Sequence, residues 1–205
     1  VYCLVVFGNI FDPRFNYLYG YGPFGAPNGE AGFSAVATGE AGANQGTQYL
    51  NAYNDYNNGD HANGNWIEAN VFQEQTIGAG DVGQVWNFTF DYKASSTAGP
   101  GGSTTAFAFI KVLDPNNGFA LVGFETFETT NASTTSWTEG QLLDIAIANG
   151  WAGNLLQFGF ISRATNYDAS GVFYDNISFE AVPEPGTLVL LGGGLLAAAM
   201  KRRKK

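Results

Sequence analysis

The segment that decides the fold class is Val85-Trp86-Asn87-Phe88-Thr89-Phe90-Asp91-Tyr92. Large aromatic side chains occupy every second position, and the positions between them are polar. Successive side chains of a β-strand point to opposite faces, so this alternation predicts a strand with one buried face and one solvated face. The segment is therefore expected to be an antiparallel strand that covers the core of an all-β protein.

Similar runs recur along the chain between turns rich in Gly and Asn. Their alternation or continuous apolar character predicts further strands at Gln48 to Tyr53, Trp66 to Ile77, Thr105 to Leu113, Phe119 to Phe127, Leu155 to Ser162 and Val172 to Ala181. The turn Asp114-Pro115-Asn116-Asn117-Gly118 predicts a hairpin, because Pro fixes φ and Asn-Gly accepts positive φ. Leu142 to Ile147 alternates weakly and fits a strand or a short helix, and Ala94 to Ser103 is predicted to be a loop.

Residues 1–181 are predicted to form one domain. Aromatic residues make up 15% of the chain and charged residues only 13%, and no stretch before Thr187 has a sustained helical period. A single open sheet would leave a large aromatic face exposed. We therefore expect an antiparallel β-sandwich, most simply a jelly roll, with an up-and-down barrel as the alternative.

Residues 182–205 form a separate segment with three parts. Pro183-Glu184-Pro185-Gly186 precedes an uncharged apolar run from Thr187 to Met200, and the chain ends in Lys201-Arg202-Arg203-Lys204-Lys205. A helix over that run would span about 21 Å, less than the roughly 30 Å of a bilayer core. The sequence therefore predicts a short hydrophobic C-terminal helix that suits brief residence in a membrane.

The charge is distributed very unevenly. Residues 1–182 contain four Lys and Arg against seventeen Asp and Glu, whereas the last five residues are all basic. The basic end is expected to stay in the cytoplasm while the acidic body crosses the membrane. A body this acidic is not expected to bind nucleic acid, which requires a basic surface.

The start of the chain is less informative than its end. Val1 to Phe7 is apolar but lacks the positive flank and small-residue cleavage site of a signal peptide. We expect it to form a first strand or to be the remainder of a longer N-terminal segment.

The tail resembles the PEP-CTERM sorting signal of Gram-negative bacteria that make exopolysaccharide. The resemblance rests on Pro183, Glu184 and Pro185, on the short Gly/Leu/Ala run, and on the basic end with Arg202 and Arg203. In that family an exosortase, a membrane-embedded protease of the transpeptidase type, removes the tail. The resemblance implies export through the inner membrane, held briefly by residues 187–200, and release to the cell surface or extracellular matrix.

A second resemblance concerns Gly171-Val172-Phe173-Tyr174-Asp175-Asn176-Ile177-Ser178-Phe179, which is similar to the closing strand of jelly rolls of the carbohydrate-binding-module kind. Three alternating apolar residues are predicted to be its buried set: Phe173, Ile177 and Phe179. The alternation places Asp175 on the same face, where an unpaired carboxylate would be costly. Backbone donors, Arg163 or a bound Ca²⁺ would satisfy it, and the resemblance implies a structural calcium near this position.

A second group of oxygen ligands lies at Asp55, Asn57 and Asp60, which could converge on a cation if the loop turns at Gly59. The spacing is not that of an EF-hand, because Trp66 stands where the bidentate Glu would be. The alternative is an Asn/Gly-rich turn whose side chains cap their own backbone. No cofactor is required by the sequence, and Ca²⁺ is the candidate.

Catalysis is not expected. His61 is the only histidine, and no nucleophile elbow accompanies it. Glu68 and Glu74 share one face of a predicted strand but would lie about 20 Å apart, beyond the separation that glycoside hydrolysis uses.

Glycan binding is the favoured function, because aromatic rings bordered by Asn, Gln and Asp can stack on sugars and bond their hydroxyl groups. Trp137 and Trp151 fall at strand ends, and Tyr53 and Tyr56 fall in or beside an Asn-rich loop. We therefore expect an exported, non-enzymatic protein that binds exopolysaccharide. The alternative is a structural matrix or biofilm protein that self-associates through sheet edges or shared Ca²⁺.

Overall fold

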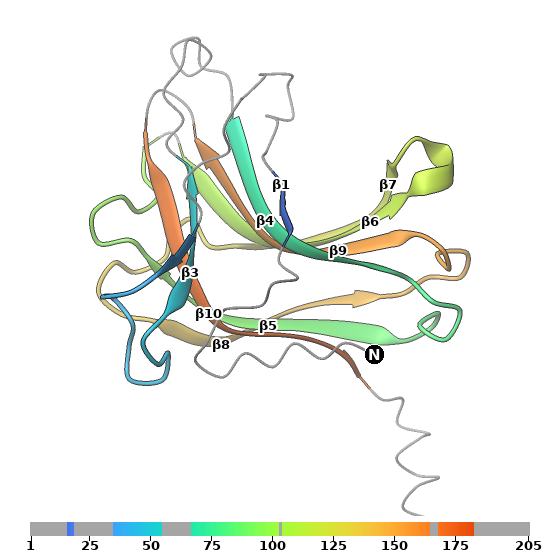
Figure 1. Cartoon of the computed structure of the whole chain (residues 1–205), viewed down its shortest axis with the longest axis horizontal. Coiled ribbons are helices and arrows are strands. Elements are labelled where there is room, and N and C mark those ends of the chain that lie inside the picture. The colour runs from blue at the N-terminus through green and yellow to red at the C-terminus, as the bar shows by residue number, and fades with distance from the viewer. Residues whose placement is uncertain (1–15, 19–34, 55–66, 103, 165–167, 183–205) are drawn as a thin grey trace, which may run out of the picture.

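The computed structural model describes residues 16–18, 35–54, 67–102, 104–164 and 168–182, which form two five-stranded antiparallel sheets packed face to face (Figure 1). Sheet A has the strand order β1 (Asn16–Leu18), β4 (Ile67–Thr76), β9 (Leu155–Ala164), β6 (Thr105–Asp114) and β7 (Ala120–Glu128). Sheet B has the order β2 (Ala35–Ala37), β3 (Tyr49–Asn54), β10 (Ser170–Val182), β5 (Val85–Ala94) and β8 (Thr138–Ala146). The predicted β-sandwich is confirmed.

The predicted strands agree with the structure to within a few residues. The segment at Leu142 to Ile147, which fitted a strand or a helix, belongs to β8. The predicted hairpin is β6–β7, which turns through the short 3-10 helix η1 (Pro115–Asn117). The Asp114 carboxylate accepts a hydrogen bond from the Asn116 backbone N–H at 2.9 Å, which caps this turn.

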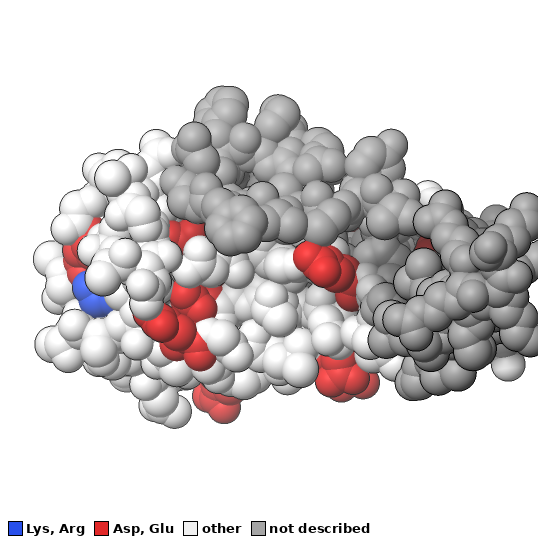
Figure 2. Space-filling view, turned by 90° about the horizontal axis from the view of Figure 1, so that it is seen from below, with Lys and Arg blue, Asp and Glu red and all other residues white. Residues whose placement is uncertain are grey.

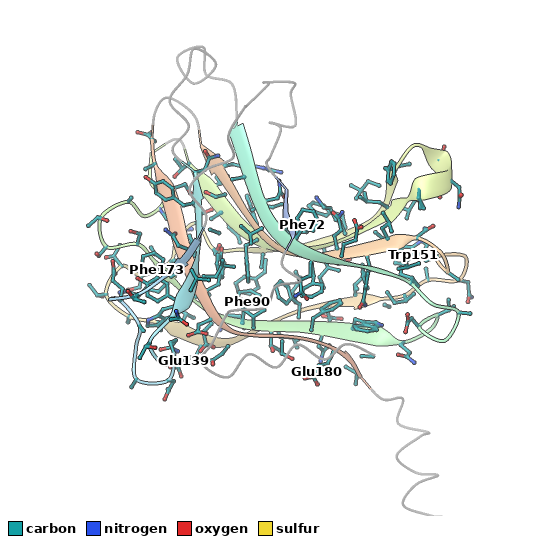
Figure 3. The ribbon with its side chains drawn as sticks, viewed as in Figure 1. Phe72, Phe90, Glu139, Trp151, Phe173 and Glu180 are labelled. Carbon is teal, nitrogen blue, oxygen red and sulfur yellow. The ribbon has the colours of Figure 1, made fainter. Side chains whose placement is uncertain are left out.

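The core lies between the two sheets and combines aliphatic side chains with buried aromatic rings (Figure 3). The aromatic residues of β5 face inward as the alternation predicted, and Phe88 and Phe90 are almost fully buried. Rings of sheet B stack directly on rings of β9: Phe179 on Phe158 at 3.9 Å between centroids, and Tyr174 on Phe160 at 3.6 Å. These two stacks join the sheets at the centre of the molecule.

The face assignment predicted for the closing strand was wrong in part. Tyr174 and Phe179 both stack on β9, although they are an odd number of positions apart in β10. A bulge between Asp175 and Ser178, with Asn176 at a φ of 49°, adds the residue that reverses the alternation. Phe173 and Asp175 therefore lie on the outer face of sheet B, whereas Ile177 shares the inner face with Phe179.

An additional layer covers part of that outer face. The segment 38–48 crosses it and is joined to β5 by an ion pair between Lys93 Nζ and Glu40 Oε2 at 2.8 Å. The Trp137 indole N–H donates a hydrogen bond to the Glu40 carbonyl at 3.1 Å. We call residues 38–48 the outer segment. It explains why polar residues on this face of sheet B are buried.

Several predictions fall outside the described residues. They concern Val1 to Phe7, the loop with Asp55, Tyr56, Asn57 and Asp60, and the C-terminal helix with its sorting signal. Within the described ranges, no helix is long and apolar enough to cross a membrane.

Candidate functional site

Four neighbouring strands place one side chain each in a straight row across the outer face of sheet A. The register aligns Phe124 of β7, Lys111 of β6, Gln157 of β9 and Glu74 of β4. Residues on either side of Lys111 in β6 point into the core, so Lys111 must point outward. We call these four side chains the sheet A row.

The sheet A row combines an exposed ring with hydrogen-bonding groups. Phe124 is 43% exposed, and Glu74 is also exposed. The Gln157 amide donates a hydrogen bond to Glu74 Oε2 at 2.6 Å. Lys111 Nζ lies 4.6 Å from the centroid of the Phe109 ring, an arrangement in which the ring stabilises the ammonium group.

Apolar groups border the row on both sides. Leu113 and Leu155 are paired on one side, and Phe109 and Phe72 are aligned on the other with Gly159 between them. Sheet A is bent, and this face lies on the inside of the bend (Figure 1). Gln157 is buried and Lys111 is half-buried, so the face presents mainly the Phe124 ring and the Glu74 carboxylate, with the Lys111 ammonium between them, to one extended polar molecule.

A second cluster of polar groups lies on the outer face of sheet B. Asp175 of β10 is paired with Asp91 of β5, and both are buried. Asp175 Oδ1 accepts the Asn176 backbone N–H at 2.7 Å, whereas Asp175 Oδ2 is buried with no hydrogen-bond partner among the described residues. Burial raises the pKa of Asp175 to about 6, opposed by the Asn176 hydrogen bond and reinforced by the Asp91 charge.

Asp91 is much better satisfied. Its Oδ1 accepts the Gly140 backbone N–H at 2.7 Å, and its Oδ2 accepts the side-chain amides of Asn176 at 2.7 Å and Gln45 at 2.8 Å. Gln45 belongs to the outer segment and also donates to Glu139 at 3.3 Å. The outer segment thus covers the carboxylates of Asp91 and Asp175. Asp175 Oδ2 remains without a hydrogen-bond partner among the described residues.

Asp175 Oδ2 is suited to bind a hard cation, which prefers oxygen ligands and would offset the negative charge of Asp175 and Asp91. No group of three or more His, Cys, Asp or Glu side chains in the described part of the chain is placed to hold a metal ion. A cation at Asp175 would therefore need amide, carbonyl or water oxygens as well. Arg163, the alternative partner, lies in sheet A, 5.4 Å from the centroid of the Phe107 ring.

The two tryptophans predicted to bind sugar are both half-buried. The Trp137 ring packs against Tyr49 at 6.0 Å between centroids, and its indole N–H donates a hydrogen bond to the Glu40 carbonyl. Trp151 lies against Gly123 of β7, where a Cβ atom would come within 2.5 Å of the indole. Both rings therefore support the local packing, and sugar binding by either stays a prediction.

Tyr53 is half-buried in β3 beside Gly171 of β10, and Tyr56 lies outside the described residues.

The sheet A row was not predicted from the sequence. The only local signal was the occurrence of Lys111 and Gln157 within otherwise apolar strands, and no local pattern shows that these strands are neighbours.

Comparison with known proteins identifies the tail and the fold. Residues 181–204 match the PEP-CTERM protein-sorting motif. No curated protein matches the chain. A cyclase from Fischerella sp. TAU is 15% identical with a TM-score of 0.52, and the match covers 83% of this chain and 85% of the cyclase. A carbohydrate-binding module of the β-sandwich superfamily is 13% identical with a TM-score of 0.50, over 84% of this chain and 58% of that chain.

At these identities the structural matches show a shared fold and no more. The sorting motif begins at residue 181, so its first two residues are also the last two of β10. The chain therefore joins a β-sandwich, a fold that it shares with a carbohydrate-binding module and a cyclase, to a PEP-CTERM sorting motif, and this motif indicates an exported, exosortase-processed cell-surface protein of a Gram-negative bacterium.

Proposed function

We propose that the protein is a non-enzymatic surface protein that binds exopolysaccharide through the sheet A row. The observation that supports this most directly is the exposed ring of Phe124 aligned with Lys111, Gln157 and Glu74. An aromatic face stacks on the C–H groups of a sugar ring, and the polar side chains can bond to its hydroxyl groups. The row crosses four strands, which suits an extended chain of sugars.

The content of the row favours binding over hydrolysis. Glycoside hydrolysis generally uses two carboxyl groups on either side of the bond that breaks. Among the four side chains of the row only Glu74 is a carboxylate, and it accepts a hydrogen bond from Gln157. The proposal therefore assigns Glu74 to sugar recognition.

The negative charge of the protein argues against one class of polysaccharide, the strongly anionic polymers. Figure 2 shows the outer face of sheet B, where acidic side chains outnumber basic ones. The whole chain has a formal charge of −9. A strongly anionic polymer would be repelled, so we propose a neutral polysaccharide, or an anionic one that is bound through divalent cations.

We also propose that Asp175 and Asp91 hold a structural Ca²⁺. The buried, unpartnered Asp175 Oδ2 supports this proposal. Bound calcium would supply the positive charge that the carboxylate pair lacks and would connect β5, β10 and the outer segment. The loop residues Asp55, Asn57 and Asp60 remain a separate candidate site.

The sorting step itself can be tested by mass. We propose that residues 187–200 hold the precursor in the inner membrane and that the exosortase then cuts near Pro183 to Gly186. Intact mass of the protein from the outer fraction, with and without the exosortase, should show loss of the tail only when the enzyme is present. A mature chain that still ends at Lys205 would contradict the proposal.

The glycan proposal is tested with polysaccharide purified from the medium of the producing cells. Phe124→Ala should weaken binding at least about tenfold in affinity electrophoresis, because the variant loses the stacking face. Leu142→Ala is the matched control, since Leu142 is 50% exposed on β8 in the other sheet. Equal affinity of both variants and the native protein would contradict the assignment of the row.

The second candidate function is a structural matrix protein that self-associates through its sheet edges. The observation that favours it is the exposure of apolar side chains on the edge strands β7 and β8, including Leu121 at 56% and Leu142 at 50%. Sedimentation that depends on protein concentration, without any affinity for polysaccharide, would favour this function.

A further inference from the structure

The tip of the β6–β7 hairpin exposes three large apolar side chains. Phe119 is 58% exposed, Leu121 56% and Val122 39%. Phe119 has a φ of 61°, a left-handed conformation that is rare for a bulky residue. Such strain at an exposed aromatic residue often marks a functional position. We call these three residues the hairpin tip.

The hairpin tip lies at the end of the sandwich where the sorting tail begins. The last residue of β10, Val182, pairs with Val85 at the start of β5, which pairs with Ala146 at the end of β8. In sheet A the same end holds the β6–β7 turn and the start of β9, since Asp114 pairs with Ala120 and Leu113 with Leu155.

Two turns complete this end of the molecule. They are residues 77–84 between β4 and β5 and residues 147–154 between β8 and β9. Backbone hydrogen bonds join them, from the Ile77 N–H to the Asn154 carbonyl at 2.8 Å and from the Gly83 N–H to the Ile147 carbonyl at 2.9 Å. The end of β10 and the hairpin tip therefore lie at the same end of the sandwich, toward the right of Figure 1, with these two turns between them. We call this end of the sandwich the end surface.

The end surface is suited to a lipid interface. Its turns, residues 77–84, 114–119 and 147–154, contain no Lys or Arg. Their two acidic residues are engaged locally: Asp81 accepts the Gly78 backbone N–H at 2.8 Å and Asp114 accepts that of Asn116 at 2.9 Å. Trp151 adds a half-buried indole, the side chain that membrane proteins favour at headgroup depth.

The tail leaves little distance between this surface and the membrane. Only residues 183–186 separate the end of β10 from the apolar run 187–200. Fully extended, that connection reaches at most about 18 Å. While the tail is in the bilayer, the end of β10 must therefore remain close to the headgroups, and a suitable tilt of the domain brings the hairpin tip to the same surface.

We propose that the hairpin tip docks on the lipid surface of the membrane that holds the sorting tail, and so orients the folded domain during processing. This inference rests on the proposed sorting function. A second copy of the chain is a less suitable occupant, because residues 183–186 hold this end of the domain near lipid while the tail is inserted, whereas nothing holds a second copy there. A weak contact is sufficient, since the tail already holds the tip at high effective concentration.

The test uses the full chain in vesicles of phosphatidylethanolamine and phosphatidylglycerol that contain a nitroxide-labelled lipid. An environment-sensitive fluorophore is attached at Asn117→Cys in a Cys3→Ser background, with Gly101→Cys as the control at the opposite end. Both positions are exposed, and Gly101 has open space around it. The nitroxide should quench the probe at 117 at least about threefold more strongly than the probe at 101.

A second variant tests the side chains themselves. Phe119→Asn with Leu121→Thr should remove most of the quenching at 117, because Asn tolerates positive φ and Thr suits a strand. The matched control, Leu142→Thr on β8, should leave the quenching unchanged.

Retention of the chain in an alkaline carbonate pellet separates the outcomes. Equal quenching at 117 and 101 in pelleted protein would overturn the membrane contact alone. A fluorescence change that follows protein concentration and not the nitroxide would assign the tip to a second copy and would also overturn it. A chain that does not pellet at all would overturn the proposed sorting function together with this inference.

Discussion

Asp175 lies directly opposite Asp91 in the antiparallel register of β10 and β5. Both carboxylates are buried, but only Asp91 has each of its oxygens hydrogen-bonded. Two carboxyl groups on directly opposite residues resist simultaneous ionisation, because the two negative charges repel each other. The centre of sheet B therefore depends on a proton or a cation.

The first prediction concerns pH in the presence of a chelator. The pKa of Asp175 rises from 3.8 to about 6 in the folded state. The folded protein thus binds this proton more tightly than the unfolded chain does. The stabilisation is complete below about pH 4 and is lost as pH rises through 6, by up to about 3 kcal/mol. Urea unfolding in the presence of EDTA, at pH values from about 4 to above 6, measures this loss of unfolding free energy.

The control for this prediction is a difference between variants. Glu40 acts in the opposite direction, because hydrogen bonds from Lys93 and Ser96 outweigh the effect of burial and lower its pKa. Asp175→Asn should remove the contribution of Asp175 to the pH dependence of stability and leave the contribution of Glu40. Asp144→Asn, at an exposed position of β8, should change neither contribution. A pH dependence that is identical in Asp175→Asn and the native protein would contradict the assignment.

The second prediction concerns calcium at neutral pH. Calcium that binds the ionised pair should raise the unfolding temperature of the native protein, by the equivalent of about 2.7 kcal/mol at a hundredfold excess over Kd. Differential scanning calorimetry with calcium and with EDTA measures the shift. Asp175→Asn should abolish it. A shift of equal size in this variant would place the ion elsewhere.

The third prediction concerns Gly159 in β9, which lies between Phe109 and Phe72 in the register. A Cβ atom there would overlap the Val71 carbonyl oxygen and lie 2.6 Å from Phe72 Cα. Backbone of β4 cannot move without breaking its pairing, so Gly159→Ala should cost about 3 kcal/mol of unfolding free energy.

Gly80→Ala is the matched control for Gly159→Ala. A Cβ atom at Gly80 would meet nothing within 4 Å, and Gly80 has no positive φ. Chemical denaturation should show a change within about 0.5 kcal/mol for this variant. Equal stability of the two variants would contradict the close approach of β4 and β9.

The fourth prediction concerns the hydrogen bond of 2.6 Å between the Tyr174 and Thr129 hydroxyl groups, both of which are buried. Tyr174→Phe should cost about 1 to 2 kcal/mol, because the Thr129 hydroxyl loses this partner in a dry site. The double variant with Thr129→Val should cost less than the sum of the two single variants. Additive costs in a double-mutant cycle would show that the two hydroxyl groups do not interact.

The fold was predictable because most of its signals are local. The alternation in β5 identified its inner face, and the Pro-Asn-Asn-Gly turn identified the β6–β7 hairpin. The candidate sites were predicted less completely. Sugar binding by Trp137 and Trp151 stays a prediction, and their half-buried positions depend on Tyr49 and Gly123, which are distant in sequence.

Neighbouring residues were sufficient to predict the all-β class, the hairpin, the acidic body and the sorting motif, because the pattern behind each of them is local. The side of sheet B that carries Asp175 depends instead on how the strands pair. The bulge at Asn176 reverses the alternation of β10, and a bulge arises from pairing with β5, more than eighty residues earlier in the chain. The same holds for the sheet A row, since Phe124, Lys111, Gln157 and Glu74 become neighbours only when four strands pair in register.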